Sequence, residues 1–397
     1  MTIANGHPTN GSEPASLASL PEYHLDYSLW QPDTPTSAAS QEFVSRLRQA
    51  MTGIGFFYLH NTPLDAKRDA MFDLVERIFA LPLETRLSIN MDNSRHFRGY
   101  CKFGDERTQS QVDFRDQIDY AVETKAVEDR SLTEKLPFLN LLGPNQFLDD
   151  SVCKGHKSIV IDWFNACSSI SDQLTRAIEL ALGVGEGELS RFQTGQGGHN
   201  DPDPELAKLG PLPYARMKTI RYPAGAVVDG IARDSKSSQG VGAHKDSGWL
   251  TLLSPSQVAG LQVQDFDGTW IDVPYLPGGL IVNFGQQVEN LTQGIVQAAT
   301  HRVLTPPDAT QTRYSVAWFS SPALNTYLSP LDKNSFDAET RRLHEQAIQR
   351  RANAQIKSDV AKGDLYARAE EPFGWINWRG LFRSHPGVVN AFYPHLV

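Results

Sequence analysis

The stretch GAHKDSGWLTLL (242–253) decides the fold. Its triplet His244–Lys245–Asp246 leads directly into an apolar, strand-like run. Side chains two residues apart on a strand project from the same face, so His244 and Asp246 are expected to converge while Lys245 points away. An imidazole and a carboxylate, joined by a second histidine, form the facial triad that binds non-haem Fe(II) and leaves coordination positions open. The stretch therefore predicts part of a metal site on a β strand.

The remaining ligand must come from another strand that faces the same cavity. His301 is the best candidate, because it lies within the strand-like run QAATHRVL (297–304). Two further His-x-Asp triplets occur, and such a short pattern is expected by chance. One is His24–Asp26 near the polar N-terminal segment, and the other is His199–Asp201 in the Gly- and Pro-rich GQGGHNDPDP (195–204). Context therefore favours His244, Asp246 and His301 as the metal ligands.

An inward-facing arginine follows on the next strand-like run, RYSVAWF (313–319). On a strand, Arg313 and Ser315 share a face with Ala317 and Phe319. Burying an arginine beside a hydroxyl is costly unless an anion pairs with it. A ligand carboxylate would supply that partner through charge-assisted hydrogen bonds, each worth on the order of 1.5–3 kcal/mol. The pattern predicts a carboxylate anchor near the metal site.

The wider chain predicts three parts. Helical patterns at 40–53, 64–80 and 155–184, with strand-like runs at 23–30 and 54–61, predict a mainly helical N-terminal part over 21–212. From 213 to 322, short apolar runs alternate with Gly, Pro and Asp, which is typical of an antiparallel sandwich or barrel. A helical pattern at 336–361 predicts a helical C-terminal extension over 323–397. We expect a flexible tail over 1–20 and a single domain over 21–397. The predicted core strands are 215–222, 248–253, 260–264, 269–273, 279–284, 297–304 and 313–320.

Composition excludes several classes of protein. With 397 residues, 40% hydrophobic and 21% charged, the chain is too apolar to be disordered. A net charge of −9 argues against nucleic acid or an anionic membrane surface as partner. No run of apolar residues is long enough to span a membrane, and the N-terminus lacks the pattern of a signal peptide. Cys101, Cys153 and Cys167 are too few for a disulfide framework, so we expect the cytoplasm.

The motifs together resemble the iron(II)/2-oxoglutarate-dependent dioxygenase family, in its isopenicillin-N-synthase-like branch. The resemblance covers roughly residues 20–330. In the N-terminal half it rests on IGFFYLHN (54–61), IFALPLETR (78–86), RGY (98–100) and GPNQF (143–147). In the second half it rests on GAHKDSGWLTLL, GLQV (260–263), WIDVP (270–274), PGGLIVNFG (277–285), THRV (300–303) and RYSVAWF.

The resemblance implies an α+β protein with a mainly β core, a double-stranded β-helix (jelly roll) flanked by N-terminal and C-terminal helices. It implies Fe(II) as the metal, with 2-oxoglutarate and O₂ as cosubstrates. It assigns the metal to His244, Asp246 and His301, and 2-oxoglutarate to Arg313, Ser315 and Tyr222, the last in IRYPAG (220–225). The chain departs from many relatives at Gln286, where Asp is common, and at Met217–Lys218, where Leu–Arg is common.

The implied reaction is the oxidation of an unactivated C–H bond of a small molecule, by hydroxylation, desaturation or oxidative cyclisation, with release of succinate and CO₂. We expect a role in specialised metabolism, and an arginine in the pocket would suit an amino-acid-derived substrate. The sequence sets no oligomeric state. The residues expected to line the substrate pocket are Arg95, Tyr100, Phe103, Trp249 and Phe319.

Three alternatives stay open at this point. An oxidase or cyclase of the same fold needs no 2-oxoglutarate, and the Arg-x-Ser pattern does not separate it from the leading hypothesis. A zinc hydrolase uses the same kinds of ligand, although the sequence holds no HExxH motif. A non-catalytic small-molecule binding module is disfavoured by the intact ligand set.

Overall fold

The computed structural model describes residues 16–108, 111–195, 204–233, 238–306, 308–354 and 370–396. Most of the tail predicted over 1–20 lies outside these residues, as do His199 and Asp201 of the Gly- and Pro-rich triplet. Within the described ranges, no helix combines the length and apolarity needed to cross a membrane.

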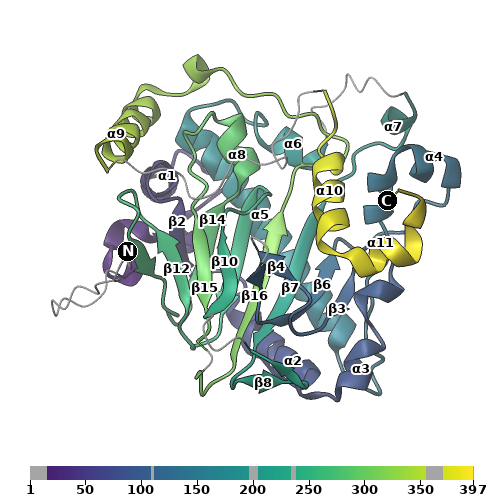
Figure 1. Ribbon diagram of the computed structural model, residues 1–397. Helices are drawn as coiled ribbons and strands as arrows, with labels where there is room; N and C mark the ends of the chain where they lie inside the picture. Colours follow the sequence, from purple (N-terminus) through teal and green to yellow (C-terminus); the bar gives the residue numbers. More distant parts are fainter. Residues whose placement is uncertain are drawn as a thin grey trace, which may run out of the picture.

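Two sheets form the centre of the molecule (Figure 1). The larger has the strand order β1-β2-β14-β11-β16-β7-β6-β3, and the smaller has the order β10-β15-β12-β13. Along the chain from β10 to β16, successive strands alternate between the two sheets, apart from the hairpin of β12 and β13. This alternation produces the predicted jelly roll. The core strands of the larger sheet are β7 (Ala215–Tyr222), β11 (Leu250–Pro255), β14 (Leu280–Phe284) and β16 (Arg313–Ser320). Those of the smaller sheet are β10 (Gln239–His244), β12 (Leu261–Gln264), β13 (Trp270–Asp272) and β15 (His301–Leu304).

Helices from the N-terminal part cover the outer face of the larger sheet, where α5 contacts β11 and β16, α2 contacts β16, and α1 contacts β2. Apolar residues at helical spacing bury one face of each helix, and Ser37 caps α1 by accepting a hydrogen bond from the Ser40 backbone. The left-handed Gly183 ends α5, as a glycine without Cβ strain allows. The helices predicted from periodicity correspond to α1 (Ala38–Thr52), α2 (Arg68–Ala80) and α5 (His156–Leu182).

The N-terminal part is less purely helical than the sequence predicted. The strands β1 (His24–Asp26) and β2 (Phe56–His60) extend one end of the larger sheet, and β3 (Gly99–Cys101) and β6 (Asp116–Ala121) extend the other. All six residues of β6 are buried, yet Asp116, Gln117 and Asp119 are polar, so the sequence lacks the apolar run that is typical of a buried strand. β10 was also missed, because its two glycines give a weak strand signal. Short strands form two hairpins, β4 (Arg107–Thr108) with β5 (Gln111–Val112) and β8 (Val227–Val228) with β9 (Ile231–Ala232).

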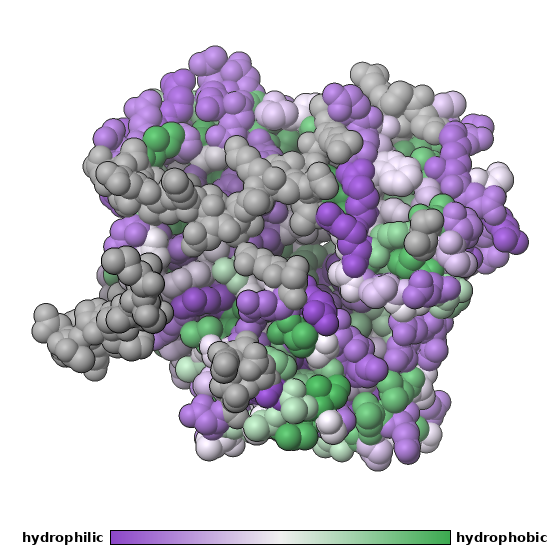
Figure 2. Space-filling view, viewed as in Figure 1, coloured by the Kyte–Doolittle hydropathy of each residue, from purple (hydrophilic) through white to green (hydrophobic). Residues whose placement is uncertain are grey.

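The C-terminal extension is helical, as predicted. Its helix α10 lies beside the open end of the jelly roll, and Figure 2 shows hydrophilic side chains along α10 and a hollow beside it. Trp378 of α10 packs edge-on against Phe97 and Tyr393, which fixes the helix to the N-terminal part. The helices of the extension are α9 (Ala338–Ala354), α10 (Gly374–Ser384) and α11 (Pro386–Phe392). The remaining short helices are α3 (Leu83–Leu87), α4 (Arg130–Lys135), α6 (Ser190–Thr194), α7 (Pro204–Lys208) and α8 (Gln286–Leu291).

A close backbone contact at Gly285 holds the segment after β10 against the end of β14. The Gly285 N–H donates to the Trp249 carbonyl at 2.7 Å, and the Gln286 N–H donates to the Asp246 carbonyl at 2.8 Å. A Cβ atom on Gly285 would lie 2.2 Å from the Gly248 carbonyl oxygen, far inside van der Waals contact. Glycine is therefore required there, and the position of Asp246 depends on it.

We predict that Gly285→Ala lowers the free energy of unfolding by about 1–3 kcal/mol, because the added methyl forces two backbone segments apart. Urea denaturation measures this change. The matched control is Gly185→Ala, whose Cβ would meet only the Glu188 side chain at 3.6 Å and should change stability by less than about 0.5 kcal/mol. Equal stability of the two variants would show that the contact is not tight.

Candidate active site

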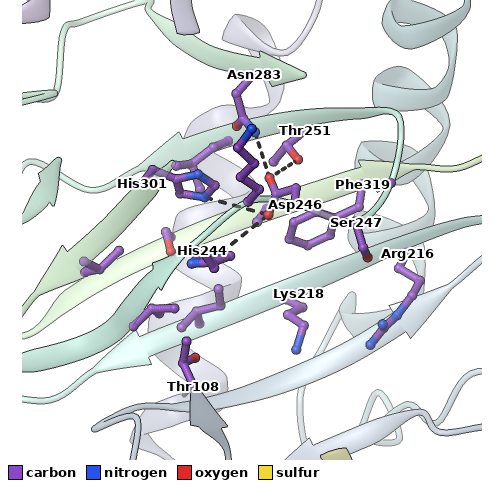
Figure 3. Close-up of a pocket in the computed structure, with 18 of the residues that line it drawn as sticks. Thr108, Arg216, Lys218, His244, Asp246, Ser247, Thr251, Asn283, His301 and Phe319 are labelled. Carbon is purple, nitrogen blue, oxygen red and sulfur yellow. Dashed lines mark hydrogen bonds and ion pairs between the residues drawn. The ribbon is translucent and has the colours of Figure 1, made fainter. Parts of the chain in front are cut away.

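Two histidines lie opposite one another on neighbouring strands of the smaller sheet. In the antiparallel pairing of β10 with β15, His244 lies opposite His301, and their ring centroids are 4.3 Å apart. The Nε2 atoms of His244 and His301 lie 3.5 Å and 3.7 Å from Oδ1 of Asp246 (Figure 3). The three ligand atoms lie within 4.8 Å of one another, a spacing that one metal ion can bridge. The structure thus brings together all three predicted metal-site residues.

The reason for this convergence differs from the one predicted. β10 ends at His244, and Asp246 lies in the bend before β11 begins at Leu250. A bend in the chain, and not the two-residue repeat of a single strand, therefore turns the carboxylate toward the imidazoles.

Hydrogen bonds aim each ligand atom at the shared point. His244 Nδ1 donates to the Gly242 carbonyl at 2.8 Å, and His301 Nδ1 donates to the Ala299 carbonyl at 3.1 Å. Because a carbonyl only accepts, these bonds place the proton on Nδ1 and leave the Nε2 lone pairs free for a metal. Asp246 Oδ2 accepts from Thr251 Oγ1 at 2.5 Å and from Asn283 Nδ2 at 2.8 Å, which leaves Oδ1 facing the histidines.

The electrostatics suit a divalent cation. Burial, together with the charge of His244, lowers the pKa of His301 to about 4. Burial alone would raise the pKa of Asp246, but the charges of His301 and His244 and the Thr251 hydrogen bond hold it well below its usual value. Burial also opposes protonation of His244, although its hydrogen bond to Asp246 and the charge of that carboxylate leave its pKa above the usual value. The site holds one fixed negative charge, and a metal would replace the proton that His244 otherwise attracts.

A buried guanidinium lies deeper in the same cavity, whose volume is about 650 Å³. Arg313 is 2% exposed, and its Nε and Nη1 atoms have no hydrogen-bond partner among the described residues. Its guanidinium carbon lies 5.0 Å from the ring centroid of Tyr222, which is opposite it on β7, and Ser315 also lines the cavity. Leaving such donors unpaired is costly, so this end of the cavity fits a carboxylate. A ligand with two acidic ends could bridge Arg313 and the metal ligands.

Among the five residues expected in the substrate pocket, only Phe319 lines the cavity. Tyr100 lies on β3 at the far edge of the larger sheet and donates to Asp116 at 2.9 Å, while Arg95 bonds Asn140. Phe103 packs against Phe114, outside the cavity. Trp249 precedes β11, and its Nε1 donates to Thr175 of α5 at 3.2 Å. β6 separates β3 from β7, the nearest strand that lines the cavity, which explains why the RGY segment does not reach it.

Several cavity residues were not predicted. Thr251 and Asn283, which orient Asp246, are polar positions inside the apolar runs WLTLL and LIVNF, and that contrast was a usable signal. Arg216 and Lys218 share the inward face of β7 with Tyr222, so strand alternation also pointed to them. The cavity residues supplied by α10 had no comparable signal in the sequence, and they are Asn377, Gly380, Arg383 and Ser384.

Comparison with known proteins agrees with this geometry. Residues 216–322 match the model of the 2OG-Fe(II) oxygenase superfamily, and residues 24–150 match the N-terminal model of non-haem dioxygenases in morphine synthesis. The chain is 31% identical over 370 residues to the 2-oxoglutarate-dependent dioxygenase frbJ of Dothideomycetidae sp. (strain 11243), covering 89% of each chain. It is 28% identical to homoarginine-6-hydroxylase 2-ODD-C23 of Glycine max, covering 84% of this chain and 94% of the relative.

The fold has a solved counterpart in full-length T7H of Neurospora crassa, crystallised with α-ketoglutarate and thymine. That structure aligns with a TM-score of 0.61 and 22% identity, over 83% of this chain and 96% of T7H. At this identity the likeness bears on the fold alone.

We predict that His301→Ala weakens binding of Fe(II) or Co(II) more than 100-fold, because it removes one of three ligand atoms, and that Thr251→Val weakens it about 10- to 100-fold by freeing the Asp246 carboxylate to turn. Anaerobic equilibrium dialysis measures both affinities. His60→Ala is the control, since His60 pairs with His24 on the edge of the larger sheet, away from the cavity. Unchanged affinity in His301→Ala would remove that residue from the metal site.

Proposed function

Because this chain belongs to the 2-oxoglutarate- and Fe(II)-dependent oxygenase superfamily, we propose that His244, Asp246 and His301 bind its Fe(II). The observation that supports this proposal most strongly is the convergence of two Nε2 atoms and one carboxylate oxygen on a single point of the cavity. Two neutral imidazoles and one carboxylate match the donor set that suits Fe(II) in such enzymes. The protein is an oxidoreductase that acts on a small molecule with 2-oxoglutarate and O₂.

Arg313 binds the far carboxylate of 2-oxoglutarate in this proposal, assisted by Ser315 and Tyr222. The support is the buried guanidinium whose Nε and Nη1 lack partners among the described residues. Between this end and the metal ligands the wall is apolar, through Ile220, Leu253 and Leu261. An apolar wall excludes water and strengthens the pairing of a carboxylate with Arg313.

Fe(II) held by His244, Asp246 and His301 would supply activation of O₂ coupled to the loss of CO₂ from 2-oxoglutarate, with oxidised substrate, succinate and CO₂ as products. The protein positions the reactants. Asn283 and Thr251 hold the Asp246 carboxylate, and the carbonyls of Gly242 and Ala299 hold the two imidazole rings. Fixed ligands keep the remaining coordination positions open for 2-oxoglutarate and O₂.

The substrate in this proposal is derived from an amino acid. The similarity to homoarginine-6-hydroxylase 2-ODD-C23 of Glycine max over 84% of the chain supports that class. The similarity to a 2-oxoglutarate-dependent dioxygenase over 89% of the chain favours use of 2-oxoglutarate over the oxidase of the same fold that needs none. We also propose a single domain over 21–397, since the N-terminal strands β1, β2, β3 and β6 complete the same sheet as the core strands. A cytoplasmic location is consistent with free thiols at Cys101, Cys153 and Cys167.

We predict that Fe(II) and 2-oxoglutarate, added anaerobically, give a visible metal-to-ligand charge-transfer band. The band should be absent in His301→Ala. In Arg313→Met, half-saturation should need at least about 10-fold more 2-oxoglutarate, because a charge-assisted hydrogen bond is lost. Absorbance titration under argon measures both effects.

The control for this titration is Arg46→Met, since Arg46 pairs with Glu42 on the exposed side of α1. In air, succinate should form in step with oxidised product. A normal band in both His301→Ala and Arg313→Met would refute the assigned site, and product without succinate would favour the 2-oxoglutarate-independent oxidase.

A further inference from the structure

The inward faces of β7 and β16 form one continuous wall of the cavity. The four cross-strand pairs on that wall are Arg313–Tyr222, Ser315–Ile220, Ala317–Lys218 and Phe319–Arg216. At roughly 3.4 Å per residue, Lys218 and Arg216 lie about 14 Å and 20 Å along β7 from Tyr222. The groups that hold Asp246 belong to β11 and β14, on the other side of β16 from β7, so we expect 2-oxoglutarate held between Arg313 and the metal to leave Lys218 and Arg216 uncovered. The far end of the wall is therefore available to the substrate.

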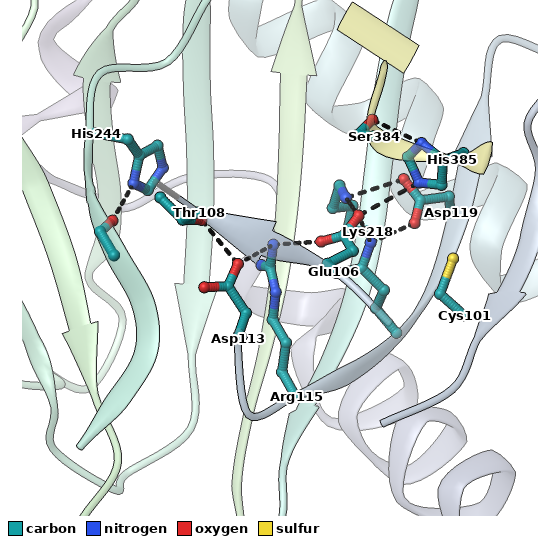
Figure 4. A network of polar contacts seen from close by, with 12 residues as sticks. Cys101, Glu106, Thr108, Asp113, Arg115, Asp119, Lys218, His244, Ser384 and His385 are labelled. Carbon is teal, nitrogen blue, oxygen red and sulfur yellow. Dashed lines mark hydrogen bonds and ion pairs between the residues drawn. The ribbon is translucent and has the colours of Figure 1, made fainter. Parts of the chain in front are cut away.

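Three cations, Lys218, Arg216 and Arg115, form ion pairs with carboxylates near this end, and Figure 4 shows Lys218 and Arg115 with Glu106 and Asp119. Lys218 Nζ lies 3.0 Å from Glu106 and 3.2 Å from Asp119, and Arg216 lies 2.8 Å from Asp119. Arg115 lies 2.5 Å from Glu106. Lys218, Arg216 and Arg115 line the cavity, whereas Glu106 and Asp119 do not. Figure 3 draws Lys218 and Arg216 along the same wall.

The charges within this ion cluster largely cancel, but only its cations line the cavity, so the cavity wall carries positive charge. Burial would raise the pKa of Glu106, but Lys218 and Arg115 hold it well below its usual value, so the carboxylate stays charged. Burial opposes the charge on Arg216, yet the charge of Asp119 outweighs it and raises the arginine pKa. A ligand group at this end of the cavity is closer to the cations than to their partners, so a carboxylate group there is attracted. Among the described lining residues, Asp246 is the one acid, and the metal site uses it.

A neutral donor from the opposite side completes the pocket. Asn377 of α10 lines the same cavity, and its Nδ2 atom is buried without a hydrogen-bond partner among the described residues. A buried amide that lacks a partner costs free energy unless a ligand accepts its hydrogen bond. A carboxylate between β7 and α10 would satisfy it.

We propose that Lys218 and Arg216, with Arg115 and Asn377, form a subsite that binds the carboxylate of an amino-acid substrate. This assignment rests on the proposed function and deepens it. The carboxylate binds at the end of the cavity that holds Lys218 and Arg216. The rest of the molecule extends toward His244, Asp246 and His301, where its C–H bond is oxidised. The salt bridges to Glu106 and Asp119 position the two cations before substrate arrives.

The test compares two ligands on the unaltered protein. Under argon, with Fe(II) and 2-oxoglutarate bound, isothermal titration calorimetry measures the affinity for L-homoarginine and for its carboxamide, which lacks the negative charge. We expect the carboxamide to bind about 10- to 100-fold more weakly. Equal affinity for the two ligands would overturn the carboxylate subsite.

Variants locate the effect. Lys218→Met should weaken binding of the free acid about 10-fold or more and leave carboxamide binding within about two-fold, whereas Lys218→Arg should retain most of the affinity for the acid. Lys67→Met is the control, because Lys67 pairs with Asp162 away from the cavity. Equal losses for acid and carboxamide in Lys218→Met would indicate a purely structural lysine and overturn the assignment.

The outcome is separable from failure of the proposed function. The charge-transfer band with Fe(II) and 2-oxoglutarate should be normal in Lys218→Met, since that residue touches neither group. A normal band together with no binding of L-homoarginine or of any proteinogenic L-amino acid would overturn the subsite and leave the oxygenase assignment standing. Absence of the band in the unaltered protein would instead overturn the proposed metal and cosubstrate residues.

Discussion

The pairing of β10 with β15 is the constraint on which the site depends. Its register sets His244 opposite His301, and both rings hydrogen-bond to nearby backbone carbonyls through Nδ1. The register shifts between Val241 and His244, so the strand is irregular just where the chain must leave it and bend to Asp246. A slip by one residue would turn a histidine to the other face of the sheet. The arrangement of the candidate metal ligands therefore depends on strand pairing as well as on the identity of the residues.

Polar groups inside the larger sheet turn this geometry into a rigid site. Asn283 of β14 and Thr251 of β11 are nearly fully buried, and both donate to the same oxygen of Asp246. Their burial is tolerated because each has a charged acceptor. Gly285 then brings the end of β14 close enough to bind the Asp246 segment through its backbone. The larger sheet thereby orients a carboxylate that the smaller sheet alone would leave loose.

A division of the cavity follows from strand alternation. β7 and β16 run antiparallel with eight paired positions, so one inward face presents Arg313 at one end and Lys218 and Arg216 toward the other, with Ser315, Ile220 and Ala317 between them. Arg313 lies at the end that suits 2-oxoglutarate, and Arg216 lies at the other. The two ends are not equivalent, because Arg313 has unpaired nitrogens whereas Arg216 is fixed by Asp119. The Arg313 end fits an anionic cosubstrate that supplies the missing partner for a buried guanidinium. The Arg216 end, where the cation already has a partner, fits a substrate that exchanges with solvent.

By itself the sequence predicted an antiparallel β core, the candidate ligands His244, Asp246 and His301, and an inward-facing Arg313, because each depends on local signals such as strand-like runs, the His-x-Asp triplet and the Arg-x-Ser pattern. The jelly roll followed from the resemblance of these motifs to a known family. Tertiary structure alone decided which side chains line the rest of the cavity. Arg95 and Trp249 turned away from it, and Asn377 entered from a helix far along the chain. The physical reason is that such residues meet through strand order and helix docking, which depend on the packing of the whole chain and leave no local periodic pattern.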